Sequence, residues 1–126
     1  MAQILLAEDE ETLRELCARA LATDGHKVKA ACDGSEALDL LAAGEGPFDL
    51  LLTDIRMPIM DGIALALAAA RDYPDLTILL MTGYADQRER AHGLDAIIHD
   101  VIAKPFTVVA LRAAVNEALT VRAARH

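Results

Sequence analysis

The sequence predicts an α/β protein built around a parallel β-sheet. Short apolar runs recur along the chain, and segments with apolar residues at helical spacing separate them. Polar or charged residues directly follow four of these runs, as expected where parallel strands end at one edge of a sheet. A chain of 126 residues is the size of one domain and can bury a core without disulfides or structural metal.

The first quarter of the chain predicts a strand, a helix and a second strand. Ile4–Ala7 is the first strand. Apolar residues between Leu13 and Leu21 then recur at i, i+3, i+4, i+7 and i+8, which predicts an amphipathic helix closed by Asp24-Gly25. Val28–Ala31 is a short strand interrupted by a lysine, as an edge strand often is.

The middle of the chain continues the alternation. A helix begins at Gly34 and runs to about Leu41, and Gly44–Pro47 reads as a loop. Phe48–Thr53 is the third strand. An alanine-rich segment from Gly62 to just before Pro74 then favours helix, because alanine has the highest helix propensity.

Two further strands and a final helix complete the pattern. The fourth and fifth strands are Thr77–Met81 and Val101–Ala103, and apolar residues from Leu111 to Leu119 stripe the last helix. Five strands joined by crossovers predict a (βα)₅ doubly wound parallel sheet. The expected order is the flavodoxin-like 2-1-3-4-5, of which CheY is a known example.

Composition narrows the class of protein. The net charge of −8 argues against a nucleic-acid surface, which needs a basic stripe. The chain has no signal-peptide start and no apolar run of membrane-spanning length. Cys17 and Cys32 lack CxxC or zinc spacing and lie in apolar contexts, which predicts buried free thiols in a reducing compartment. We therefore expect a soluble cytoplasmic protein.

Polar groups at the strand ends predict a site at the carboxyl edge of the sheet. Glu8 and Asp9 follow the first strand, Asp54 the third, Thr82 the fourth and Lys104 the fifth. Three carboxylates contribute a charge of −3, which one Mg²⁺ and one lysine balance. Because Mg²⁺ takes oxygen ligands and lysine binds phosphate as a point charge, the cluster suggests a magnesium site and phosphoryl chemistry.

The same residues carry a resemblance to a known family. Glu8-Asp9, the segment Asp54–Gly62 (DIRMPIMDG), Thr82-Gly83 and Lys104-Pro105-Phe106 occur in the order found in the receiver domains of bacterial response regulators, the CheY-like family. The likeness extends from Gln3 to about Leu119. It implies a phosphoacceptor protein of a two-component system or phosphorelay rather than an enzyme.

The resemblance also implies roles for individual residues. Asp54 is the expected phosphoacceptor, which would form an aspartyl phosphate. Glu8 and Asp9, with Asp54 and the backbone carbonyl of Arg56, are the expected Mg²⁺ ligands. Lys104 is expected to contact the phosphoryl group and to precede a cis peptide bond to Pro105, and Thr82 to supply the switch hydroxyl.

Simpler interpretations compete with these roles. Asp9 could cap the first helix, and we expect it to do so in part. Asp54 could merely end a strand, and Thr82-Gly83 could be an ordinary turn. Asp61 is expected to cap the helix that begins at Gly62.

Two departures from the family pattern bear on signalling. Many receivers have an aromatic residue three positions before the lysine, where this chain has Val101, so Tyr84 could substitute for it or simply pack on the surface. In the segment 86–100, Gly93 interrupts early and Ile97-Ile98 occupy a turn, which predicts a fourth helix that is short, displaced or mobile.

The expected organisation is a receiver over residues 1–120, a short tail over 121–126 and no output domain, so that the protein signals in trans. A histidine kinase or a histidine phosphotransfer protein is the expected donor. Short motifs also resemble the CpdR-like regulators of alphaproteobacteria, which implies a ClpX-type protease component as one possible output partner. No nucleic-acid or membrane partner is expected.

Two other classes of protein stay open. A phosphatase of the haloacid dehalogenase type would need a second carboxylate at position 56, where this chain has arginine. A pseudo-receiver would bind partners without phosphorylation, although all five side chains of the acceptor site are present.

Overall fold

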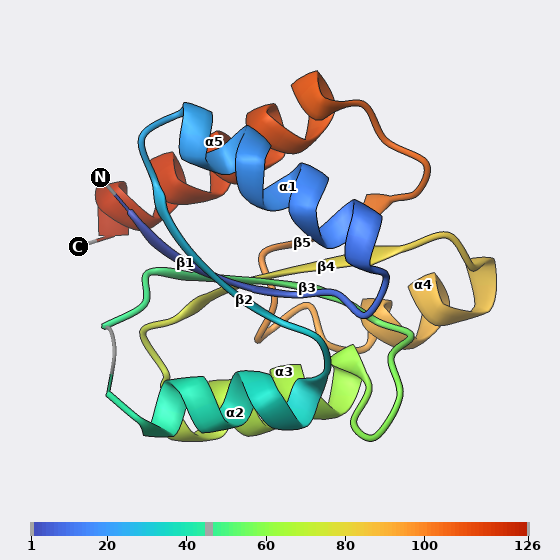
Figure 1. Ribbon diagram of the computed structural model, residues 1–126. Coiled ribbons are helices and arrows are strands. Elements are labelled where there is room, and N and C mark those ends of the chain that lie inside the picture. The colour runs from blue at the N-terminus through green and yellow to red at the C-terminus, as the bar shows by residue number, and fades with distance from the viewer. Residues whose placement is uncertain (1, 45–46, 126) are drawn as a thin grey trace.

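Five parallel strands form one sheet in the order β2-β1-β3-β4-β5 in the computed structural model of the protein (Figure 1). The structure describes residues 2–44 and 47–125, without the side chains of residues 85–87 and 92. The predicted flavodoxin-like order is confirmed, and the second strand lies at an edge as predicted. The strands are β1 (Gln3–Ala7), β2 (Lys27–Ala31), β3 (Leu50–Asp54), β4 (Thr77–Thr82) and β5 (Asp100–Ala103).

Helices cover both faces of the sheet. Figure 1 shows α1 (Glu11–Thr23) and α5 (Val108–Arg125) on one face, with α2 (Gly34–Ala42) and α3 (Gly62–Asp72) on the other. The fourth helix, α4 (Ala85–His92), has eight residues and ends at Gly93, which confirms the predicted short helix. None of the helices in the described part of the chain is long and apolar enough to cross a bilayer.

Residues of the central strands alternate between two apolar clusters. Ile4 and Leu6 of β1 pack with α1 and α5, whereas Leu5 and Ala7 pack with α2 and α3. Because both faces are covered, the central strands are apolar at nearly every position, and their polar residues come only at the ends. At the carboxyl ends of β3 and β4 these polar residues are Asp54 and Thr82, which lie at the same edge of the sheet.

Several local predictions can be compared with the structure. Asp61 caps α3, and its carboxylate accepts the Ala64 N–H at 2.8 Å, as predicted. The expectation that Asp9 caps α1 is wrong. The N-cap residue is Glu10, one residue later, and its side chain makes no capping hydrogen bond. The Lys104-Pro105 bond is cis, as predicted.

The two cysteines differ in environment. Cys17 is fully buried in α1, and burial raises the pKa of its thiol to about 11. Cys32 is exposed, so its predicted burial is wrong. It follows the edge strand β2, which has a neighbour on one side alone.

Some boundaries differ from the predicted ones. β3 begins at Leu50, and Phe48 is buried just before it rather than within it. α5 continues to Arg125, through most of the segment predicted as a tail. His126 and residues 45–46 of the predicted Gly44–Pro47 loop lie outside the described residues.

Candidate functional site

Three carboxylates meet at the carboxyl edge of the sheet. Glu8 follows β1 and Asp54 ends β3, and these two strands are neighbours. Oxygen atoms of Glu8, Asp9 and Asp54 all lie within 4.8 Å of one another. Glu8 is fully buried and Asp54 is 7% exposed, whereas Asp9 faces solvent. The group therefore has a buried floor and one open side.

Lys104 joins this group from the end of β5. Its Nζ lies 2.8 Å from Oε1 of Glu8 and 3.0 Å from Oδ2 of Asp54. Its backbone N–H donates to the carbonyl of Thr82 at 2.9 Å, which ties the end of β5 to the end of β4. The lysine thus neutralises one of the three negative charges directly.

Burial and charge oppose each other in this cluster. Burial raises the pKa of Glu8, and the repulsion from Asp54 adds to it, while hydrogen bonds from Lys104 and from the Glu10 N–H act in the opposite direction. Burial alone would lower the pKa of Lys104, but its bonds to Glu8 and Asp54 outweigh that effect, and the net direction is upward. Lys104 therefore stays charged beside the acids.

Thr82 is buried at the end of β4. It is 1% exposed, and its Oγ1 accepts the backbone N–H of Tyr84 at 3.1 Å. The hydroxyl of this last β4 residue thereby holds Tyr84 in the loop that leads into α4. This position lies one strand away from Asp54, since β3 and β4 are paired.

A cavity of about 800 Å³ opens above these residues. Two of its lining residues, Arg56 and Tyr84, make a cation–π contact that the sequence did not predict. The guanidinium carbon of Arg56 lies 4.7 Å from the ring centroid of Tyr84. The family resemblance implies a role only for the backbone carbonyl of Arg56, and that carbonyl remains a predicted ligand. The cavity is lined by Glu8, Asp9, Glu10, Leu13, Asp54, Arg56, Gly83, Tyr84, Lys104, Pro105 and Phe106.

The loop from β3 to α3 approaches the site closely at Gly62. A Cβ atom on Gly62 would lie 2.1 Å from the carbonyl oxygen of Asp54, so only glycine fits. The Gly62 N–H also donates to the carbonyl of Ile55 at 2.7 Å. In the same loop Ile59 has a positive φ of 69° and is 84% exposed, an uncommon conformation for a β-branched residue. The loop is held in a defined shape beside Asp54.

Comparison with known proteins identifies the family. Residues 4–116 match the response regulator receiver domain. The chain belongs to the response regulator receiver domain family. Response regulator MprA of Mycobacterium avium is 37% identical over 111 residues, which are 88% of this chain and 48% of that protein. The chain spans about half the length of the curated relatives it matches.

Solved structures agree with this family. The response regulator TrrA of Thermotoga maritima, in complex with Mg²⁺-BeF, has a TM-score of 0.83 at 29% identity, with 94% of this chain and 99% of that chain covered. A receiver domain protein of Clostridium thermocellum has a TM-score of 0.89 with full coverage of both chains; at 24% identity it shows the fold alone. Receiver domains are signalling modules of two-component systems and interact with histidine kinases or phosphotransfer proteins.

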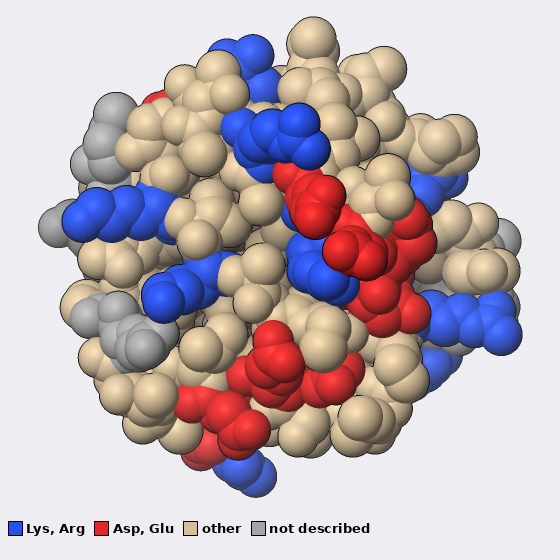
Figure 2. All heavy atoms as spheres, viewed as in Figure 1, with Lys and Arg blue, Asp and Glu red and all other residues tan. Residues whose placement is uncertain are grey.

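The acidic cluster of this receiver domain fits a divalent cation. Three carboxylates within 4.8 Å of one another supply the hard oxygen ligands that Mg²⁺ prefers. Asp9 is exposed, so an ion can reach the cluster from its side. Figure 2 shows further acidic side chains gathered over α1 and α2 on the face viewed there. Lys and Arg side chains lie on the same face, while the chain as a whole carries a net charge of −8.

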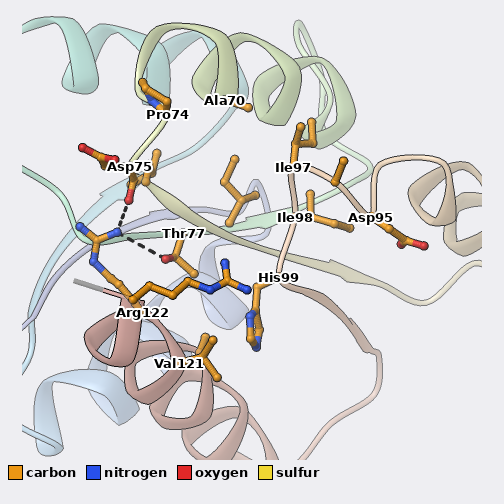
Figure 3. A pocket seen from close by; sticks show the side chains of 15 residues that line it. Ala70, Pro74, Asp75, Thr77, Asp95, Ile97, Ile98, His99, Val121 and Arg122 are labelled. Carbon is orange, nitrogen blue, oxygen red and sulfur yellow. Dashed lines mark hydrogen bonds between the residues drawn. The ribbon is translucent and has the colours of Figure 1, made fainter.

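A second cavity, of about 730 Å³, lies at the opposite end of the strands (Figure 3). Arg122 of α5 reaches into it and donates to the carbonyl of Asp75 and to Oγ1 of Thr77. These bonds hold α5 against the start of β4. The lining of this cavity includes none of the residues predicted for the chemistry of the receiver domain.

Proposed function

We propose that Asp54 is the phosphoacceptor of this receiver domain. The observation that carries the proposal is the position of its carboxylate, which is nearly buried, 3.0 Å from Nζ of Lys104 and within 4.8 Å of two other carboxylates. A carboxylate in this setting can act as a nucleophile toward phosphorus. The Mg²⁺-BeF complex of TrrA supports the same interpretation.

In the proposed step, a carboxylate oxygen of Asp54 forms a bond to the phosphorus of a phosphohistidine on the donor. The phosphorus–nitrogen bond breaks, and its electron pair leaves on the imidazole, which then takes a proton. Lys104 holds Asp54 in place and stabilises the charge on the transferring oxygens. Glu8, Asp9, Asp54 and the carbonyl of Arg56 would hold Mg²⁺, which when bound neutralises charge on the phosphoryl group.

Thr82 is the proposed switch residue. Phosphorylation replaces a carboxylate of charge −1 by a group with a charge near −2 and new acceptor oxygens. The hydroxyl of Thr82 can turn toward one of these oxygens and give up its bond with the Tyr84 N–H. The loop that leads into α4 then loses a fixed point, which transmits the change to a partner.

The remaining parts of the proposal concern the partners. A histidine kinase or phosphotransfer protein is the proposed donor. We propose that residues 1–120 act as the receiver. A CpdR-like role in ClpX-dependent proteolysis is a narrower form of this proposal.

A phosphorylation assay tests the acceptor. The protein is incubated with a small acyl phosphate and Mg²⁺, and its intact mass is measured. We expect an adduct of one phosphoryl group on the wild type, none on Asp54→Asn, and an unchanged adduct on Asp61→Asn, a nearby loop aspartate that caps α3.

The outcomes separate the three classes of protein. An adduct that persists on Asp54→Asn refutes the assignment of the acceptor. No adduct on the wild type favours a pseudo-receiver, and continuous release of phosphate from small phosphate esters favours an enzyme. Thr82→Ala should still accept the phosphoryl group while losing most of the difference in partner affinity between the two states.

A further inference from the structure

Besides the bond from the Arg88 N–H to its carbonyl at the start of α4, two contacts tie Tyr84 to the edge of the cavity. Its backbone N–H donates to Oγ1 of Thr82 at 3.1 Å, and its ring lies under the guanidinium of Arg56 at 4.7 Å. Tyr84 is 49% exposed, so about half of its surface is open to solvent. Tyr84 is also the residue that immediately precedes α4.

A phosphoryl group on Asp54 would attract both of these partners. The lining of the cavity in the described part of the chain contains two cations, Lys104 and Arg56. Lys104 is already shared between Glu8 and Asp54. Additional negative charge on Asp54 therefore leaves Arg56 as the second cation able to respond from within the cavity.

Arg56 has more to gain from the phosphoryl group than from the ring. An exposed cation–π contact is weak, whereas a guanidinium can form paired, charge-assisted hydrogen bonds with phosphate oxygens. The side chain of Arg56 belongs to the loop that starts at Asp54, two positions along the chain, and lines the same cavity. Movement of this one side chain removes the ring contact of Tyr84.

We propose that the contact between Arg56 and Tyr84 acts as a latch. The latch is closed in the unphosphorylated protein, and phosphorylation of Asp54 opens it. The proposal rests on Asp54 being the phosphoacceptor. When Arg56 pairs with the phosphoryl group and Thr82 turns inward, Tyr84 loses both contacts in one event. The latch thereby couples the site to the start of α4 in a chain that has Val101 instead of an aromatic residue in β5.

The proposal can be tested by NMR of the isotope-labelled 126-residue chain. Stacking on an aromatic ring moves the resonances of the Arg56 side-chain protons upfield by a ring current. We expect this shift in the unphosphorylated protein and its loss after treatment with a small acyl phosphate and Mg²⁺. Tyr84→Phe should keep the shift and Tyr84→Leu should abolish it, which assigns the resonance to the stack.

A second measurement tests the coupling without phosphorylation. In Arg56→Gln the stack is absent, so the Tyr84 N–H should exchange with solvent about two- to fivefold faster, the factor that corresponds to one exposed cation–π contact. Arg71→Gln is the matched control, because it removes the same charge from an exposed side chain paired with Asp72 at the end of α3. Its Tyr84 exchange should equal that of the wild type.

The results distinguish the latch from the acceptor. If intact mass shows the adduct but the ring-current shift of Arg56 persists, the latch is wrong and the acceptor stands. Equal Tyr84 exchange in Arg56→Gln and the wild type also overturns the latch. If no adduct forms on the wild type, the proposed function fails first.

Discussion

Helices α3 and α4 both follow a strand that ends at the site, yet they are held very differently. α3 has a side-chain cap from Asp61 and five buried residues: Gly62, Ile63, Leu65, Ala66 and Ala69. α4 has no side-chain cap, and among its described side chains Ala91 is buried while residues 88–90 are exposed. Tertiary packing supplies most of the stability of helices in proteins. We therefore expect α3 to be the more stable of the two helices that follow the loops around the site, and α4 the less stable.

Hydrogen exchange should show the largest difference between the two helices. Amides of α3 should exchange only when the whole domain unfolds, whereas those of α4 should exchange through local opening. We expect opening free energies that differ by about 5 kcal/mol, given typical domain stabilities. Native-state exchange measured by mass spectrometry or NMR would check this, and equal protection of both helices would contradict the comparison.

The start of α3 provides the next largest effect. Gly62→Ala places a Cβ 2.1 Å from the carbonyl oxygen of Asp54, and backbone must move to make room. We expect a loss of about 3 kcal/mol in the free energy of unfolding, at the upper end for overpacking. Urea denaturation would measure it. A loss below the error of the measurement would mean that this loop is less rigid than its contacts indicate.

Removal of the α3 cap should have a moderate effect. Asp61→Ala leaves the Ala64 N–H without its side-chain acceptor, which costs about 1 kcal/mol in the free energy of unfolding. The exposed contact between Asp61 and Arg90, at 3.5 Å, contributes little. Asp61→Asn keeps the acceptor oxygen and should recover most of the stability in the same denaturation experiment.

The smallest effect should come from the glycine that ends α4. A Cβ on Gly93 would lie 3.6 Å from the nearest atom, the carbonyl oxygen of Arg90, and its φ of −69° suits any residue. Gly93→Ala should therefore stabilise the protein, by about 0.5 kcal/mol through the lower entropy of the unfolded chain. Slower exchange across α4 should accompany the gain. Destabilisation would show that the α4 end is packed more tightly than described.

The arrangement of the acidic residues was predictable because parallel strands end at a common edge. That rule alone brought Glu8, Asp54 and Lys104 together before their distances were known. The weakness of α4 was predictable as well, since its sequence lacks apolar residues at helical spacing. Both predictions depend on periodicity and strand order, which are properties that a single sequence displays.

Other features depend on contacts that sequence patterns do not encode. Cys32 has apolar neighbours in the chain, but the edge position of β2 leaves it exposed. Asp9 has the chemistry of a helix cap, yet α1 starts too late for it to serve as one. The stack of Arg56 on Tyr84 joins two loops whose relative position is set by the packing of β3 against β4, so no local pattern could predict it.

The bonds of the β3–α3 loop have a mechanical consequence. The Ile55 N–H donates to the carbonyl of Met81, and the carbonyl of Met60 accepts from the Gly34 N–H, so this loop is fastened to β4 and to α2. Among the described residues, the loop from β4 into α4, on the opposite side of the site, makes fewer hydrogen bonds to other elements. When a group between two loops of unequal stiffness becomes larger, the more flexible loop undergoes most of the displacement. If Asp54 is phosphorylated as proposed, we therefore expect the resulting displacement to be directed away from α3 and toward α4.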